Sequence, residues 1–124
     1  MFYALIVGSR SFDNYELLKE KCDFLLQNKT DIIVVSGGAK GTDSLAERYA
    51  KEKGYPIRVF PVLPEHWEKY GKRAGFLRNQ AMHQYISEAD NRGCIVFWDG
   101  ISKGAQQSFK LAEKYNNPIR VVKV

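Results

Sequence analysis

The stretch that decides the fold is residues 32–44, IIVVSGGAKGTDS, where an apolar run leads into a glycine-rich turn and the start of a helix. Its first four residues, Ile32–Val35, are all β-branched, which is typical of a strand buried on both faces. Short runs rich in Val, Ile and aromatic residues recur at Tyr3–Val7, Ile57–Phe60, Cys94–Trp98 and Ile119–Val122. Five such runs predict the five strands of a parallel sheet.

Helical spacing of apolar residues marks the segments between these strands. Four segments carry an apolar face, made by Leu17, Leu18, Cys22, Leu25 and Leu26 in the first, by Leu45, Ala46, Tyr49 and Ala50 in the second, by Leu77, Ala81, Met82, Tyr85, Ile86 and Ala89 in the third, and by Ala105, Phe109 and Ala112 in the fourth. Asp13 and Glu16 are spaced as in a capping box that begins the first helix. The alternation predicts an α/β fold, a single Rossmann-like domain over residues 1–124 with a five-stranded parallel sheet and helices on both faces.

The composition narrows the class of protein. The chain has 124 residues and a formal net charge of +5, which favours anionic partners without separating a nucleotide from a nucleic acid. No apolar run approaches the ~20 residues of a membrane span, and the first residues lack the features of a signal peptide. Cys22 and Cys94 have no CxxC spacing, as in a reducing cytosol, and the two histidines lack metal-ligand spacing. We therefore expect a cytoplasmic protein with no metal, no cofactor and no membrane partner; a homo-oligomer is compatible with this composition.

Glycine is concentrated on one side of the predicted sheet. Eight of the ten glycines follow the first four strands, and only Gly54 and Gly93 lie at the opposite edge. Turns occur at both edges, so this one-sided distribution favours close approach of the backbone to a ligand. In parallel sheets ligands bind beyond the carboxyl ends of the strands, which is the edge where the glycines gather.

The glycine-rich turn of residues 36–44 predicts a phosphate site. Gly37 and Gly38 allow a tight turn, and a helix that starts near Gly41 directs free N–H groups and the positive end of its dipole at the same place. The pattern is neither a Walker A motif nor a Rossmann GxGxxG motif. Asp43 beside a phosphate suits a ribose hydroxyl; the alternative is that this residue and its neighbours only cap the helix.

The other connections supply cations and aromatic rings. In the first, Arg10 suits a two-pronged contact with phosphate, although a solvated surface arginine is the alternative. The third connection is long, and within it Pro64–Tyr70 is expected to form one or two helical turns. Trp67 or Tyr70 would stack on a base beside the following cations, or Trp67 would only pack the loop down.

Two further groups complete the candidate site. Arg78 and Asn79 are expected to open the third long helix, and Asp99 and Lys103 lie in the fourth connection. The candidate catalytic carboxylates are Asp43, Glu47 and Asp99. The residues predicted to bind the ligand are Gly8, Ser9, Arg10, Ser36, Gly37, Gly38, Lys40, Gly41, Thr42, Asp43, Trp67, Tyr70, Lys72, Arg73, Arg78, Asn79, Asp99, Gly100 and Lys103.

Four motifs occur in order across nearly the whole chain: VGSRSF, VVSGGAKGTDSLAERYA, PEHWEKYGKRAGFLRNQAM and FWDGISKG. Together they resemble the YspA-type, YpsA-related branch of the SLOG superfamily, which unites the SMF/DprA DNA-processing proteins and the LOG nucleotide hydrolases on a Rossmann-like fold. The resemblance implies a nucleotide or an ADP-ribose-like ligand at the glycine-rich loop, and a role as its sensor or processor.

The sequence departs from the LOG hydrolases at the residues that matter for catalysis. Those enzymes carry Pro-Gly-Gly-x-Gly-Thr-x-x-Glu, whereas here Ser36 replaces the proline and Leu45 stands where the glutamate belongs. Glu47 lies about half a turn further on and, at ~100° per residue, points elsewhere. Residues 36–43 are closer to the DprA-like pattern Ser-Gly-x-x-x-Gly-x-Asp. Asp43, at a helix N-terminus, is expected to have a lowered pKa and to act as a base or a ribose ligand.

The sequence therefore predicts a module that binds a phosphorylated, ribose-containing small molecule at the carboxyl edge of the sheet. Two alternatives stay open. A nucleotide N-glycoside or phosphoester hydrolase would need one of the candidate carboxylates beside the scissile bond. A DprA-like nucleic-acid binder would need a continuous basic surface.

Overall fold

A computed structural model describes all of residues 1–124 and confirms the α/β fold. The sheet has five strands, all parallel, in the spatial order β3-β2-β1-β4-β5. The strands are β1 (Phe2–Gly8), β2 (Ile32–Ser36), β3 (Ile57–Val59), β4 (Arg92–Trp98) and β5 (Ile119–Lys123). Each of the five predicted runs is a strand, so the Rossmann-like architecture follows from the apolar pattern.

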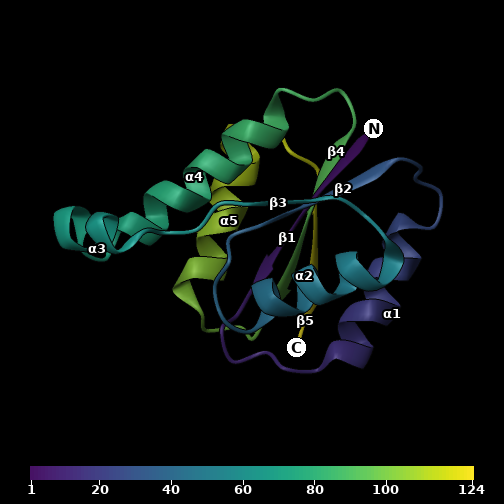
Figure 1. The fold of residues 1–124 in the computed structure, drawn as a ribbon, viewed down its shortest axis with the longest axis horizontal. Helices are drawn as coiled ribbons and strands as arrows, with labels where there is room; N and C mark the ends of the chain where they lie inside the picture. The colour runs from purple at the N-terminus through teal and green to yellow at the C-terminus, as the bar shows by residue number, and fades with distance from the viewer.

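The five helices are α1 (Tyr15–Leu26), α2 (Thr42–Lys53), α3 (Pro64–Tyr70), α4 (Arg73–Ser87) and α5 (Lys103–Lys114). Four of the five helices cover the two faces of the sheet, and α3 lies beyond it against α4 (Figure 1). Alternate residues of β1 serve the two faces: Ala4 and Ile6 pack with α1 and α2, and Leu5 and Val7 pack with α4 and α5. This period of two is what a strand buried on both sides requires. None of the helices is long and apolar enough to cross a membrane.

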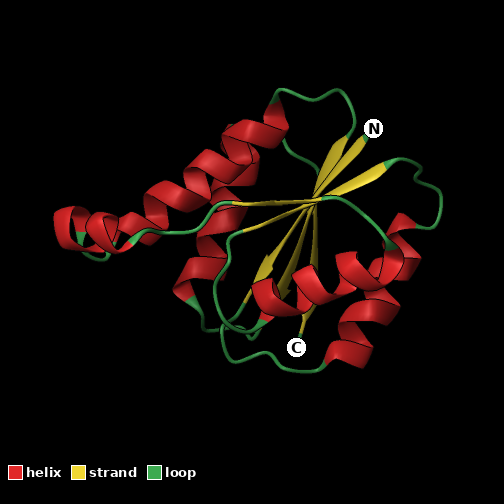
Figure 2. Ribbon diagram, in the orientation of Figure 1, coloured by secondary structure: helices red, strands yellow, loops and turns green.

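The short helix α3 stands apart from the two cores. It forms where one or two helical turns were expected, contains no buried residue and packs against α4. Figure 2 shows it at the end of the molecule farthest from the strands. Its aromatic side chains therefore lie outside the two hydrophobic cores.

Two predicted helix starts were wrong. Asn14, not Asp13, caps α1, because its side chain accepts a hydrogen bond from Leu17 N at 3.1 Å. Helix α4 begins at Arg73, so Arg78 lies in its second turn rather than at its N-terminus. The glycine at position 75 suggested a break, but a Cβ there would come within 3.8 Å of the Trp67 ring. That is an ordinary van der Waals contact, and the helix continues through Gly75.

The strand order reverses between β1 and β4. From β1 the chain moves outward through β2 to β3, then returns to place β4 on the other side of β1. The loops that follow β1 and β4 therefore leave the sheet in opposite directions. This reversal is where open α/β sheets form their ligand crevice.

Candidate functional site

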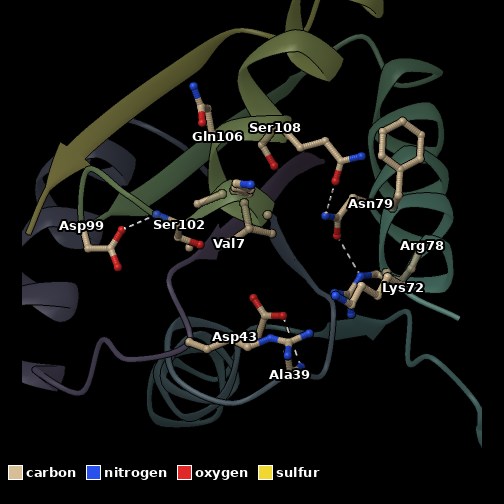
Figure 3. A pocket seen from close by; sticks show the side chains of 18 of the residues that line it. Val7, Ala39, Asp43, Lys72, Arg78, Asn79, Asp99, Ser102, Gln106 and Ser108 are labelled. Atoms are coloured by element: carbon tan, nitrogen blue, oxygen red, sulfur yellow. Dashed lines mark hydrogen bonds between the residues drawn. The ribbon is translucent and has the colours of Figure 1, made fainter. Parts of the chain in front are cut away.

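An open cleft of about 1050 Å³ lies at this reversal, beyond the carboxyl end of β1. Val7 and Gly8 lie at its base, and α4, α5 and the start of α2 supply most of the surrounding residues. Figure 3 looks into it, with Asp99 and Ser102 on one side and Lys72, Arg78 and Asn79 on the other. Its volume is at the upper end of the range for small-molecule pockets, ~300–1,000 Å³.

The lining of the cleft is rich in positive charge. Its basic residues are Arg10, Lys72, Arg78, Lys103 and Lys110, against only two acidic residues, Asp43 and Asp99. The first turn of α5 also lines the cleft, and a helix N-terminus favours anions. The electrostatics of the cleft therefore suit an anionic ligand.

The structure brings nine of the predicted ligand-binding residues into this cleft and leaves ten outside it. Those inside are Gly8, Arg10, Asp43, Trp67, Lys72, Arg78, Asn79, Asp99 and Lys103. Those that do not line it are Ser9, Ser36, Gly37, Gly38, Lys40, Gly41, Thr42, Tyr70, Arg73 and Gly100. The role of both sets in binding stays a prediction.

Several residues outside the cleft join the loops that surround it. Ser9 O accepts hydrogen bonds from Thr42 N at 3.3 Å and Thr42 Oγ1 at 3.0 Å, and Ser9 Oγ accepts from Asp99 N at 3.1 Å. A Cβ at Gly41, where φ is +74°, would collide with the carbonyl oxygen of Arg10. The ends of β1, β2 and β4 are therefore held together by this small buried cluster.

Some backbone N–H groups of the glycine-rich loop already donate hydrogen bonds to nearby side chains. Ser36 Oγ accepts from Gly38 N at 3.3 Å, and Asp43 Oδ2 accepts from Ala39 N at 3.2 Å (Figure 3). A Cβ at Gly38 would lie 3.1 Å from Val59 Cγ1, on the side of β3. Two N–H groups expected to hold phosphate are thus already bonded within the chain.

Arg78 is fixed in place but keeps most of its donors. Its Nε donates to Asn79 Oδ1 at 2.8 Å, and its Nη1 donates to Gly37 O. Three of the five guanidinium N–H groups remain, including both on Nη2, which suffices for a forked contact with an oxyanion. Asn79 Nδ2 in turn donates to Gln107 Oε1 at 3.0 Å. This chain of bonds links the β2 loop, α4 and α5, and Figure 3 shows the two bonds made by Asn79.

Asp43 has the opposite pKa shift from the one expected. Only 5% of the residue is exposed, and this burial raises its pKa to about 6, assisted by nearby Glu47. The Ala39 N–H, Arg78 and Arg10 oppose the rise without cancelling it. Loss of hydration outweighs the helix N-terminus here, because a buried carboxylate loses the water that stabilises its charge. Asp43 therefore titrates close to neutral pH.

The other two candidate carboxylates are engaged in local structure. Glu47 Oε2 accepts from Ser36 Oγ at 3.3 Å and does not line the cleft. Asp99 Oδ1 accepts from Ile101 N at 2.9 Å and Ser102 N at 2.7 Å, and these bonds lower its pKa. Asp99 therefore stays ionised near neutral pH and shapes the turn that leads into α5.

Sequence reasoning missed several residues that line the cleft. Phe76, Ile101, Gln106, Gln107 and Lys110 all line it. A signal was present in α5, because Lys103, Gln106, Gln107 and Lys110 follow helical spacing and so share one face. No group of three or more His, Cys, Asp or Glu side chains is placed to hold a metal ion.

Comparison with known proteins places these features in a family. The family model described as YspA, cpYpsA-related SLOG family matches residues 4–70. The gene 61 protein of Mycobacterium phage D29 is 34% identical over 121 residues, which cover 94% of this chain and 92% of that protein.

Two solved structures share the fold. DNA processing protein A (DprA) of Streptococcus pneumoniae superposes with a TM-score of 0.68 at 20% identity, covering 100% of this chain and 51% of that one. DprA of Helicobacter pylori, described as binding single-stranded DNA, gives 0.66 at 21% identity, covering 97% and 64%. The chain thus spans about half the length of the first protein and under two thirds of the second, and likeness at this identity establishes the fold alone.

Proposed function

Because the chain belongs to the YspA, cpYpsA-related SLOG family, we propose that its cleft binds a phosphorylated, ribose-containing small molecule, as a binding or sensor module. Nucleotides and ADP-ribose-like compounds are of this class. The observation that carries the proposal is the charge of the cleft, where five cations converge on the carboxyl edge of the sheet against two carboxylates. A cleft of this kind concentrates anions and favours their binding.

Arg10 and Arg78 are the groups best suited to the phosphate. Arg10 is exposed and its side chain makes no hydrogen bond or ion pair within the chain, so its guanidinium is free to bind. Arg78 keeps a forked pair of donors and is positioned by Asn79 and Gly37. Lys103 adds a third cation at the start of α5, beside the positive end of that helix.

Asp43 suits the ribose. One of its oxygens accepts from Ala39 N, which leaves the other to accept from a hydroxyl inside the cleft. A buried group that can only accept hydrogen bonds binds ligands with a hydroxyl at that position more tightly than ligands without one. Trp67 lines the same cleft and supplies a ring for the base.

Isothermal titration with AMP, NAD and ADP-ribose tests the proposal directly. Arg10→Gln should weaken binding of the compound that binds by about 10- to 150-fold, since a hydrogen bond to a charged group contributes ~1.5–3 kcal/mol. Arg120→Gln is the matched control, because Arg120 is exposed on β5 and does not line the cleft. A panel without binding at millimolar concentrations, or equal losses in both variants, would refute the proposal.

A second candidate function rests on the pKa of Asp43. A carboxylic acid in a cleft that titrates at about 6 is poised to donate or accept a proton near neutral pH. This favours an N-glycoside or phosphoester hydrolase. A hydrolase would release free base or phosphate from AMP over many turnovers. This activity would be abolished in Asp43→Asn and kept in Glu47→Gln. Without turnover in the wild type, the binding module stands alone.

A further inference from the structure

Ile101 is the most exposed large apolar residue of the chain, although its loop is firmly held. Its side chain is 82% exposed at the cleft. Asp99 Oδ1 accepts from the backbone N–H groups of Ile101 and Ser102, and Ser9 Oγ accepts from Asp99 N. Trp98 Nε1 donates to Ser102 O at 3.1 Å. The loop therefore presents an isoleucine to solvent at a fixed position.

Helices α3 and α4 present two aromatic rings to the same cleft. Phe76 of α4 is 49% exposed, Trp67 of α3 is 41% exposed, and both line the cleft. Neither ring belongs to either hydrophobic core. The Trp67 ring lies beside the first turn of α4, at ordinary contact distance from Gly75. The fold does not need these rings in this position.

We infer that Ile101 on one side and Phe76 with Trp67 on the other form a slot for a planar ring, which the nucleobase of the bound ligand occupies. The inference rests on the proposed function and fixes the direction of the ligand: the phosphate lies toward Arg10 and Arg78, and the base toward the apolar mouth. Tyr70, the other aromatic residue expected to stack on a base, does not line the cleft and takes no part.

The cleft combines positive charge with exposed apolar side chains, which favours a phosphorylated ligand that carries a planar ring. The cations need an anionic group, whereas three exposed apolar side chains from separate segments need a non-polar surface. Single exposed apolar residues are common on proteins, but a cluster at the rim of a cleft marks a binding site. A phosphorylated molecule with a flat ring satisfies both parts, because every base has a face that stacks on an aromatic side chain.

The test compares AMP with ribose 5-phosphate, which has the phosphate and the sugar but no ring. Wild-type protein should bind AMP about 5- to 150-fold more tightly, the range that stacking of one base contributes. Ile101→Ser and Phe76→Ser should each reduce that ratio and leave the affinity for ribose 5-phosphate unchanged. Phe24→Ser is the matched control, since Phe24 is 67% exposed on α1 and lies outside the cleft.

The outcomes separate this inference from the proposal beneath it. If neither compound binds the wild type, and neither NAD nor ADP-ribose binds, the proposed function fails. If NAD or ADP-ribose binds but AMP does not, the slot for the base of AMP is refuted. If both bind equally well, or the variants weaken both compounds alike, the phosphate site stands and the slot is refuted. If a short oligonucleotide binds far more tightly than AMP, the slot belongs to a nucleic-acid strand, which also overturns the inference.

Discussion

Replacing Asp43 by asparagine should stabilise the free protein at neutral and alkaline pH. Burial raises the pKa of Asp43 from 3.8 to about 6, so keeping it ionised above pH 6 costs about 3 kcal/mol, at 1.36 kcal/mol per pKa unit. Asparagine has no charge to desolvate and retains an oxygen that can accept from Ala39 N. We expect Asp43→Asn to be about 2–3 kcal/mol more stable at pH 8, which is a rise of roughly 10 °C in Tm for a domain of this size.

The stability difference between Asp43→Asn and wild type should depend on pH. Native Asp43 binds its proton more tightly than the unfolded chain does, so its contribution to stability falls as pH rises from about 4 to about 6 and is constant above. The advantage of Asp43→Asn should therefore be full at pH 8 and nearly absent at pH 4. The pKa of His83 is lowered by burial to about 4, which acts in the opposite direction over much of the same range. Only the difference between variant and wild type isolates Asp43.

Thermal and urea unfolding of both proteins between pH 4 and pH 8 measure that difference. Asp99→Asn is the control of opposite sign, because bonds to Ile101 N and Ser102 N lower the pKa of Asp99 and its charge favours the fold. That variant should be less stable at pH 8. If Asp43→Asn is less stable than wild type at pH 8, Arg10 and Arg78 outweigh the effect of burial on Asp43. If the stability difference between the two proteins is the same at every pH, the pKa of Asp43 is not raised in the folded protein.

Three further predictions follow from the structure. A short oligonucleotide should show no binding by fluorescence anisotropy at 150 mM salt; submicromolar affinity that falls about 10³-fold between 50 and 200 mM salt would instead indicate a nucleic-acid binder. Gly41→Ala should destabilise the protein far more in urea than Gly54→Ala, because both have φ +74° but only Gly41 has backbone where the Cβ would go; equal losses would contradict the close approach. His83→Gln should lose less stability than wild type between pH 6.5 and pH 4, since a buried neutral histidine must charge as pH falls; an unchanged acid profile would show that another group is responsible.

The sequence predicts the fold of this protein well because the fold depends on local pattern. Runs such as Ile32–Val35 have few structural alternatives, since β-branched residues bounded by turn residues favour a buried strand. Helix boundaries are less well determined. Asp13 and Asn14 are both good caps, and only the observed bond to Leu17 N distinguishes them.

The site depends on contacts between distant segments, which sequence patterns do not specify. Position 43 was correctly expected at a helix start, but its pKa is controlled by burial beneath the loops after β1 and β2. Ile101 is an ordinary loop residue until the topology places it at the cleft. Gln107 becomes part of the cleft through its bond with Asn79, 28 residues earlier in the chain. Local reasoning finds the edge of the sheet and many of the charges, but not the walls between them.

Three features of the cleft have no counterpart within the chain. Asp43 is buried at a cost in free energy, Ile101 and Phe76 expose apolar surface, and Arg10 has no partner within the chain. A site that only stabilised the fold would exchange the carboxylate for an amide and bury or replace the apolar side chains. Each feature matches a different part of one molecule: a hydroxyl, a planar ring and an anionic group. Their convergence at the strand reversal is therefore a stronger argument for a nucleotide-like ligand than any one of them taken alone.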